Sequence, residues 1–244
     1  MLSKSQIKLI TSLKQKKYRE KHQLFIAEGK KIIFELLQSN LQLYRLYATS
    51  LEFDVSEDLY THISENELKK ISSFKTPNAA LAVFNIPMAS TINFDNLIVA
   101  LDNVSDPGNL GTIIRLCDWF GVKDLVCNLD TVDCYNPKVI QATMGSITRV
   151  NVTYQNLSDL LTQTNEPKFG TYMDGENVYD MVLPNSGVLV LGNEANGISK
   201  DIESQITQRL SIPRFGDLQV TESLNVANAT AILLSEFKRR FTET

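Results

Sequence analysis

The chain has 244 residues, of which 43% are hydrophobic and 21% are charged, as in an ordinary globular protein. This length suffices for two compact domains or one large one. It contains no apolar run approaching the roughly 18 residues that cross a bilayer, and the residues after Met1 are polar and charged. We therefore expect neither a membrane span nor a signal peptide, and we place the protein in the cytoplasm.

The formal net charge of −4 conceals an uneven distribution. Residues 1–90 carry 13 Lys and Arg against 9 Asp and Glu, a balance of +4, whereas residues 91–244 carry 11 against 19, a balance of −8. Such a basic N-terminal region is either a solvated face or a surface that binds nucleic-acid phosphates. The candidate phosphate-binding residues are Lys16, Lys17, Arg19, Lys21, Lys30 and Lys31.

Residues 1–88 are expected to form a small α/β domain. Apolar residues at helical spacing predict helices within 1–15 and 29–38, and a capping-box pattern predicts another at about 64–71. Apolar runs predict strands at 24–27, 43–48 and 79–86. The segment from Pro87 to Asn96 is polar and lacks periodicity, so we place the domain boundary there.

Beyond the boundary, strands alternate with helices, which predicts a mostly parallel sheet covered on both faces. The expected strands are 97–101, 125–127, 149–154, 169–173, 188–191 and 210–213. The expected helices are one that follows a turn-rich loop at 102–109 and ends near Gly121, then 137–147, 159–163 and 223–240.

Several kinds of site are disfavoured by what the sequence lacks. His22 and His62 have no Cys or acidic partners at ligand spacing, so neither a metal site nor a histidine-based triad is expected. Cys117, Cys127 and Cys134 form no C-x-x-C pair and are expected to be small core side chains. No Rossmann or P-loop glycine motif is present. Any catalysis must therefore use Arg, Asn, Glu and Ser.

Three polar motifs lie at strand ends or at the start of a helix. They are Asn109-Leu110-Gly111-Thr112-Ile113-Ile114-Arg115, Gly192-Asn193-Glu194-Ala195-Asn196-Gly197, and Ile212-Pro213 followed by Ser223-Leu224-Asn225-Val226. Polar groups in such places form the usual ligand crevice of an open α/β sheet. In this order, the motifs resemble those of the SpoU (TrmH-type) branch of the SPOUT RNA methyltransferases, over residues from about 96 to 240.

The resemblance implies a fold and a function. The α/β domain 96–244 is expected to contain a deep trefoil knot and to dimerise through its last helix, and residues 1–88 to be an L30e-like domain that binds the RNA substrate. The expected reaction transfers a methyl group from S-adenosylmethionine to a ribose 2′-hydroxyl of RNA, large-subunit rRNA first and tRNA second. The preference for rRNA rests on the L30e-like first domain.

The resemblance assigns catalysis to Asn109, Arg115, Glu194, Ser223 and Asn225. A ribose hydroxyl must lose its proton or have its developing alkoxide stabilised. The base proposed in the family maps onto Arg115, but a guanidinium pKa above about 12 makes that role demanding. We favour binding of the neighbouring phosphate and stabilisation of the alkoxide, with a surface ion pair as the alternative.

The other four residues also have structural alternatives. Asn109 could orient Arg115 or the ribose, or cap its helix. Glu194 could fix Arg115 or Asn225, or be a solvated loop charge. Ser223 could bind the nucleophile or cap the last helix, and Asn225 could contact donor and acceptor or be structural. The resemblance implies that S-adenosylmethionine is held by backbone around Leu191, Gly192, Ser211, Ile212 and Leu224.

One loop departs from the family pattern. Residues 214–222 make it longer than usual, which could alter the mouth of the cofactor site or add a base-stacking Phe215. Two other classes of function stay open at this point. The first is a non-catalytic RNA-binding protein, which would have no need of the five catalytic candidates. The second is an enzyme that uses another nucleotide, for which this sequence contains no phosphate-cradling loop.

Overall fold

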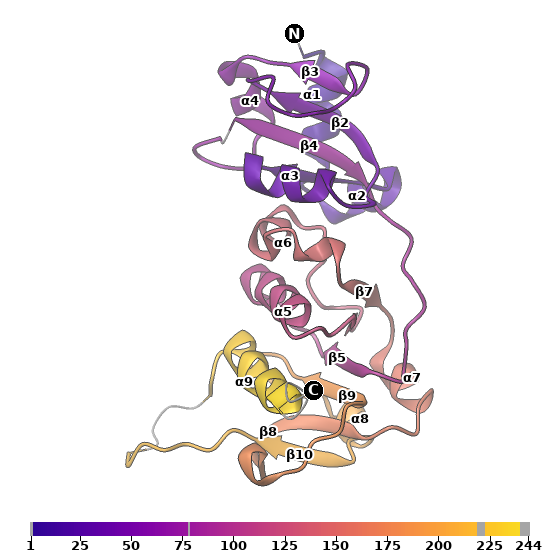
Figure 1. Cartoon of the computed structure of the whole chain (residues 1–244), viewed down its shortest axis with the longest axis vertical. Helices are drawn as coiled ribbons and strands as arrows, with labels where there is room; N and C mark the ends of the chain where they lie inside the picture. Colours follow the sequence, from indigo (N-terminus) through magenta and orange to yellow (C-terminus); the bar gives the residue numbers. More distant parts are fainter. Residues whose placement is uncertain (1, 78, 219–222, 240–244) are drawn as a thin grey trace. The chain divides into compact units, whose positions relative to one another are not determined.

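The computed structural model describes residues 2–77, 79–218 and 223–239, which divide into two compact units (Figure 1). The first unit joins Met1–Met88 to Asp133–Thr148, and the second joins Ala89–Val132 to Arg149–Thr244. Each unit has its own sheet and its own core. The segment 133–148 falls within the range 96–244 expected for the second domain, yet it packs with the first unit.

The first unit contains a four-stranded sheet in the order β1-β4-β2-β3, antiparallel except for the pair β2–β3. Its strands are β1 (Leu24–Glu28), β2 (Leu43–Ala48), β3 (Tyr60–His62) and β4 (Ala80–Asn85). Its helices are α1 (Lys4–Ser12), α2 (Lys16–His22), α3 (Lys30–Leu37), α4 (Glu65–Ile71), α6 (Pro137–Thr143) and the 3-10 helix η1 (Ser146–Thr148). The three strands and three helices predicted for residues 1–88 are confirmed. Helix α2 was not predicted, because its sequence is charged and shows no apolar spacing.

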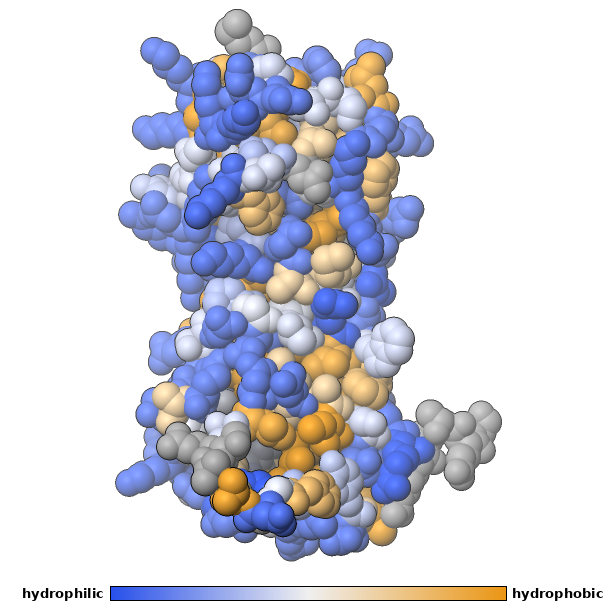
Figure 2. Space-filling model, turned by 90° about the vertical axis from the view of Figure 1, so that its left-hand side faces the viewer, coloured by the Kyte–Doolittle hydropathy of each residue, from blue (hydrophilic) through white to orange (hydrophobic). Residues whose placement is uncertain are grey.

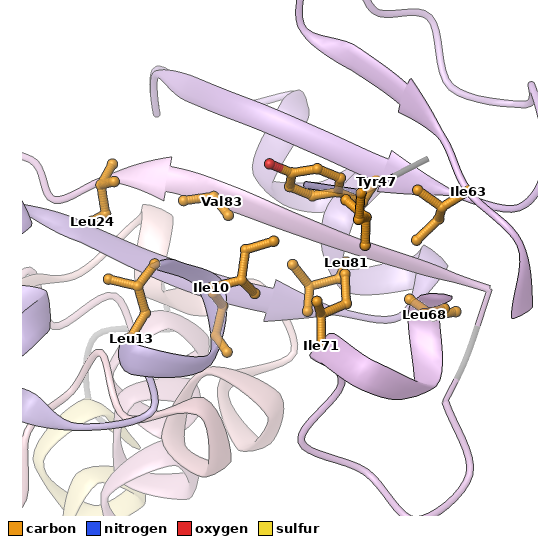
Figure 3. Close-up of a cluster of buried hydrophobic side chains, with 11 residues drawn as sticks. Ile10, Leu13, Leu24, Tyr47, Ile63, Leu68, Ile71, Leu81 and Val83 are labelled. Carbon is orange, nitrogen blue, oxygen red and sulfur yellow. The ribbon is translucent and has the colours of Figure 1, made fainter. Parts of the chain in front are cut away.

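Apolar side chains from α1 and α4 pack on this sheet (Figure 3). Ile10 and Leu13, with none of their surface exposed, come from α1 and the residue after it. The predicted capping box starts α4: the Ser64 hydroxyl accepts from the Glu67 N–H, and the Glu67 carboxylate accepts from the Ser64 N–H. The N–H groups of Ser64 and Leu2 lower the Glu67 pKa to about 2. This carboxylate therefore links the start of α4 to the N-terminal residues.

The segment 133–148 packs against β1 through α6. The Tyr135 ring lies 4.9 Å from the Phe25 ring, measured between centroids. Burial raises the pKa of the Tyr135 hydroxyl. An aromatic contact of this kind contributes beyond the area it buries, so the segment is part of the first unit's core.

The helix predicted at 137–147 ends earlier, at Thr143. Met144 and Gly145 follow with φ angles of 51° and 95°, in the left-handed region that a continuing helix cannot adopt. A side chain at Gly145 would also place its Cβ 2.8 Å from the Cβ of Glu35. The expected helix is therefore wrong in its second half, where this glycine allows a close approach to α3.

The second unit contains a six-stranded, fully parallel sheet in the order β10-β8-β9-β5-β6-β7. Its strands are β5 (Leu97–Leu101), β6 (Asp124–Cys127), β7 (Asn151–Tyr154), β8 (Lys168–Asn177), β9 (Gly187–Leu191) and β10 (Gln208–Ser211). Its helices are α5 (Pro107–Trp119), α7 (Leu157–Thr162), α8 (Lys200–Glu203), α9 (Val226–Arg239) and the 3-10 helix η2 (Val178–Asp180). The predicted parallel α/β domain is confirmed. The short helix α8 was not predicted.

Helices cover both faces of this sheet (Figure 1). Ile98 and Val190 point to the face covered by α7 and α8. The opposite face carries Phe169 of β8, whose ring meets that of Phe237 of α9 edge-on at 5.1 Å. Helix α5 packs beside α9. The continuous apolar strands are explained by this double burial.

The three cysteines are buried, as predicted, and form no disulfide. Burial raises the pKa of the Cys127 thiol to about 12, which keeps it protonated and unreactive at neutral pH. In the part of the chain that the structure describes, no helix is long and apolar enough to cross a bilayer.

Candidate active site

The order of the strands places the predicted motifs at one point of the sheet edge. The first strand of this sheet along the chain is β5. Strands β6 and β7 are added on one side of β5, and β8, β9 and β10 follow on its other side. Strands β5 and β9 are neighbours, so the loops that follow them leave the sheet side by side and in opposite directions. Such a switch point is where open α/β sheets bind ligands.

A buried carboxylate joins these two loops. Asp102, 1% exposed, directly follows β5 and accepts hydrogen bonds from the Asn128 side chain at 3.0 Å and the Ser199 N–H at 2.7 Å. Sequence reasoning did not select Asp102. A carboxylate immediately after a buried parallel strand is a signal that could have found it, because a buried charge requires partners.

The loop after β9 is a tight turn that presents Glu194. The backbone N–H and carbonyl groups of Asn193 and Gly197 bond each other, both at 2.9 Å. The Asn193 side chain donates to the Asn103 carbonyl at 2.7 Å and accepts from the N–H groups of Ala195 and Asn196. The turn that carries Glu194 is therefore fixed by backbone and side-chain bonds together.

Asn109 lies in the first turn of α5 and does not cap the helix. The cap is Asp106, whose carboxylate accepts from the Asn109 N–H at 2.8 Å. The Asn109 amide is consequently available for longer-range contacts, and its Nδ2 donates to Glu194 Oε1 at 2.9 Å. Glu194 was expected to fix Arg115 or Asn225; in the structure it holds Asn109, which in turn binds Asn225.

Asn225 connects the last helix to the same pair. Its Nδ2 donates to Asn109 Oδ1 at 2.8 Å, while its own Oδ1 accepts from the N–H groups of Ala227 and Asn228. Asn225 is therefore both the cap of α9 and a contact to the site. The capping role considered for Ser223 is wrong, because the helix begins three residues later. Ser223 is exposed and lines the cavity described below.

Arg115 is exposed on α5, six residues beyond Asn109. No hydrogen bond or ion pair of Arg115 is found within residues 2–77, 79–218 and 223–239, so the surface ion pair considered as an alternative has no support there. The structure thus brings Asn109, Glu194 and Asn225 into one chain of hydrogen bonds and leaves the Arg115 guanidinium open to solvent.

Beside this chain of hydrogen bonds lies a cavity of about 930 Å³ (Figure 2). Apolar surface gathers around a hollow in the lower part of that view. Four of the five residues expected to hold the cofactor line the cavity: Leu191, Gly192, Ile212 and Leu224. Ser211 does not line it, because its hydroxyl donates to the Gly175 carbonyl at 2.9 Å.

A wall of the cavity that sequence reasoning missed comes from an irregularity in β8. The ladder with β10 passes from Gly170 directly to Glu176, and the residues between them leave it. Thr171, Tyr172 and Met173 of this excursion line the cavity. The sequence of the strand predicted at 169–173 gave no signal for this bulge.

The cavity fits S-adenosylmethionine. Its volume lies in the range of about 300–1,000 Å³ typical of small-molecule sites, and its lining is mostly apolar, with Glu194, Arg214 and Asp217 as the charged residues. The backbone at Gly192 approaches the backbone of Gly197 so closely that an added Cβ would lie 2.2 Å from the Gly197 carbonyl carbon. A mostly apolar wall with accessible backbone groups suits an adenine ring and a ribose.

The basic residues predicted to bind RNA have different environments in the first unit. Lys17, Lys21 and Lys31 are exposed. Lys30 pairs with Glu52 at 2.6 Å, and Lys16 lies 3.9 Å from Glu20. Exposed pairs of this kind exchange readily with other partners.

Arg19 does not belong to this surface. It is 2% exposed, and its guanidinium donates to the Asp133 carboxylate at 2.8 Å and to the Leu13 carbonyl at 2.8 Å. Its prediction as a phosphate contact is corrected: Arg19 sits in an otherwise charged helix, but its side chain holds the segment 133–148 to α2.

Replacing Arg19 with alanine is expected to destabilise the protein by about 3 kcal/mol, because the Asp133 carboxylate, whose side chain is only 14% exposed, would lose the cation that balances its charge. Chemical denaturation measures this change. Lys21→Ala, on the exposed side of the same helix, serves as the control and should change stability by less than about 0.5 kcal/mol. Equal stability of both variants would contradict the structural role of Arg19.

Comparison with known proteins agrees with this arrangement. A family model described as the SpoU rRNA methylase family matches residues 96–235, more than half of the chain. The chain belongs to the SpoU rRNA methylase family. It is therefore an S-adenosylmethionine-dependent RNA methyltransferase. A second model, described as an MRM3-like substrate binding domain, matches residues 4–82.

Relatives of known activity and structure extend this assignment over nearly the whole chain. The chain is 30% identical to the Bacillus subtilis 23S rRNA (guanosine(2553)-2′-O)-methyltransferase RlmP, over 91% of each protein. It is similar to a Porphyromonas gingivalis protein assigned to the TrmH family of RNA methyltransferases, with 39% identity, a TM-score of 0.89, and coverage of 98% and 99%. The AdoMet-bound rRNA methyltransferase from Sinorhizobium meliloti is 27% identical, with a TM-score of 0.86 and coverage of 98% and 96%.

Proposed function

We propose that this SpoU family member methylates a ribose 2′-hydroxyl of large-subunit rRNA. The observation that carries the proposal is the chain of hydrogen bonds from Asn225 through Asn109 to Glu194 beside a cavity that fits the methyl donor. Relatives that act on 23S rRNA at a 2′-oxygen support the substrate. The same relatives are bacterial, which supports a cytoplasmic location.

The donor, when bound, supplies an electrophilic methyl group. The residues of the chain then have to position a ribose hydroxyl and stabilise its alkoxide. The Asn109 side chain donates to Glu194 through its nitrogen and accepts from Asn225 through its oxygen, so it fixes the orientations of both side chains. We assign the second Glu194 oxygen to accept a hydrogen bond from the 2′-hydroxyl, and the second N–H of the Asn225 amide to donate to the ribose. Positioning of this kind is a large part of what a transfer reaction needs.

Arg115 completes the proposed site from α5. Its guanidinium carries a permanent charge and has no internal partner among the described residues. We assign it to the phosphate next to the target ribose and to the alkoxide that develops during transfer. Ser223, on the cavity wall, is assigned a contact to the nucleophile. The exposed lysines of the first unit are assigned to more distant phosphates.

A homodimer through α5 and α9 is part of the proposal. Val226, Leu233 and Phe237 form one apolar face of α9, and this face is buried in the chain's own core. A separate shallow groove is lined by Phe120, Tyr179, Ala231, Ile232, Ser235 and Glu236. Near it Trp119 is 84% exposed, which is unusual for so large an apolar side chain. We therefore assign the groove to the subunit contact.

An Ile232→Asp variant is expected to shift the protein from dimer to monomer, because a carboxylate would be desolvated in the contact. Sedimentation velocity measures the change, and circular dichroism checks that the fold is retained. A wild-type protein that sediments as a monomer at micromolar concentration would rule out this interface.

The proposal also assigns binding of the RNA substrate to residues 1–88 and methyl transfer to residues 96–244. A trefoil knot within residues 96–244 is part of the same proposal. They are supported by the family match at 96–235 and by the separate match at 4–82. Knots are rare exceptions among folds, so likeness to the family is the argument for this one.

The test of the function uses unmodified 23S rRNA and methyl-labelled S-adenosylmethionine. We expect label in a nucleotide whose 3′ bond resists alkaline hydrolysis, as a 2′-O-methyl ribose requires. Label on a base, or transfer to tRNA and not to rRNA, would contradict the proposed substrate.

A further inference from the structure

The loop between β10 and α9 forms one wall of the cavity and exposes one aromatic ring. From residue 212 to residue 218, every residue except Phe215 lines the cavity. The Phe215 side chain is 82% exposed. The neighbours of Phe215 on both sides thus line the cavity, while its own side chain is exposed outside the lining.

A second ring lies next to Phe215. Tyr179, in η2, has its ring centroid 6.3 Å from that of Phe215, with an angle of 34° between the planes. Tyr179 is 38% exposed. Tyr179 also lines the groove assigned to the subunit contact, so the Phe215 ring is the one left open to a ligand, and Tyr179 supports it from the side. We call Phe215 and Tyr179 the aromatic platform.

The position of the aromatic platform beside the cavity limits which part of a bound RNA can lie on it. The oxygen that attacks must come within about 3 Å of the methyl group, so the target ribose lies at the cavity mouth. Arg214 and Gly216, the neighbours of Phe215, both line that cavity. The base of the target nucleotide, or of one beside it, therefore passes near the platform.

The chemistry of the platform matches a base. Unpaired bases in RNA are commonly recognised by stacking on exposed aromatic side chains. Tyr179 belongs to the groove assigned to the subunit contact as well, but Phe215 does not line that groove. We propose that Phe215, supported by Tyr179, stacks on a nucleobase of the strand that carries the target ribose. This inference rests on rRNA being the substrate.

Stacking should affect RNA binding more than methyl transfer. Removing one base–aromatic stack costs about 1–3 kcal/mol; we take about 1.4 kcal/mol, in the lower half of this range, which corresponds to roughly tenfold weaker RNA binding. The affinity for S-adenosylmethionine should not change, because the Phe215 ring does not line the cavity.

The experiment measures the Kd of unmodified 23S rRNA by filter binding without the donor, and the KM and kcat for the same RNA with it. Phe215→Ala and Phe215→Leu should both raise Kd and KM about tenfold, whereas Phe215→Tyr and Phe215→Trp should stay within about twofold of wild type. Val182→Ala removes a side chain that is 77% exposed outside the cavity, and it serves as the control.

Each other outcome overturns the inference. Equal Kd and KM for all Phe215 variants would show that no base stacks there. Leucine restoring wild-type binding would show an apolar contact without stacking. A shift from dimer to monomer in sedimentation would assign the ring to the second subunit. Wild-type protein that does not methylate the rRNA would refute the proposed function itself, and would be seen before any variant is compared.

Discussion

Replacing Arg115 with alanine is expected to lower kcat by about 100- to 1,000-fold, the usual effect of removing one group that stabilises a developing oxyanion. The side chain is exposed and has no internal partner among the described residues, so the fold does not depend on it. The melting temperature and the Kd for S-adenosylmethionine should therefore match those of wild type. Single-turnover kinetics with 23S rRNA measure the chemical step.

Thr112→Ala is the matched control, because Thr112 is exposed on the same helix about one turn earlier. Arg115→Lys separates charge from geometry: a lysine keeps the positive charge but cannot bind a phosphate through two parallel hydrogen bonds. We expect it to recover only part of kcat. A fully active Arg115→Ala enzyme would remove Arg115 from the mechanism.

The second large effect is expected at Gly192. An added Cβ would lie 2.2 Å from the Gly197 carbonyl carbon and 2.4 Å from the Ile198 nitrogen, both backbone atoms. The turn that carries Glu194 must then move. Because this turn both lines the cavity and holds Asn109, Gly192→Ala should weaken S-adenosylmethionine binding by at least about 100-fold, roughly 3 kcal/mol.

Calorimetry measures that affinity, and a melting curve shows whether the whole protein or only the site is affected. Gly216→Ala provides the comparison within the same cavity wall, since its added Cβ meets nothing within 4 Å. Its effect on donor affinity should be far smaller. Similar affinities for the two variants would show that the close approach at Gly192 is not what shapes the site.

The sequence predicted the parts of the fold that depend on local pattern. The apolar run 188–191 is β9, and the capping box at Ser64 starts α4. Pattern failed where distant contacts decide the outcome. Arg19 lies in a charged helix that looks solvated, and only the fold shows Asp133 beside it. The helix from Pro137 ends at Thr143, two residues before a glycine whose conformation is needed for the approach to α3.

The same distinction holds for the site. The motifs placed Asn109, Glu194 and Asn225 at strand ends and helix starts, which is a local property. The Asn109–Glu194 bond follows from the β5–β9 pairing and the Asn225–Asn109 bond from the packing of α5 on α9, both of which join residues far apart in the chain. Asp102 and the β8 bulge were missed because their significance comes from neighbours that no single stretch contains.

A crystal structure of the protein with S-adenosylmethionine tests the central claim most directly. The donor should occupy the 930 Å³ cavity, contact the backbone at Gly192 and Ile212, and direct its methyl group toward Glu194 and Asn225. A donor bound outside this cavity, or a methyl group directed away from those two side chains, would contradict the account.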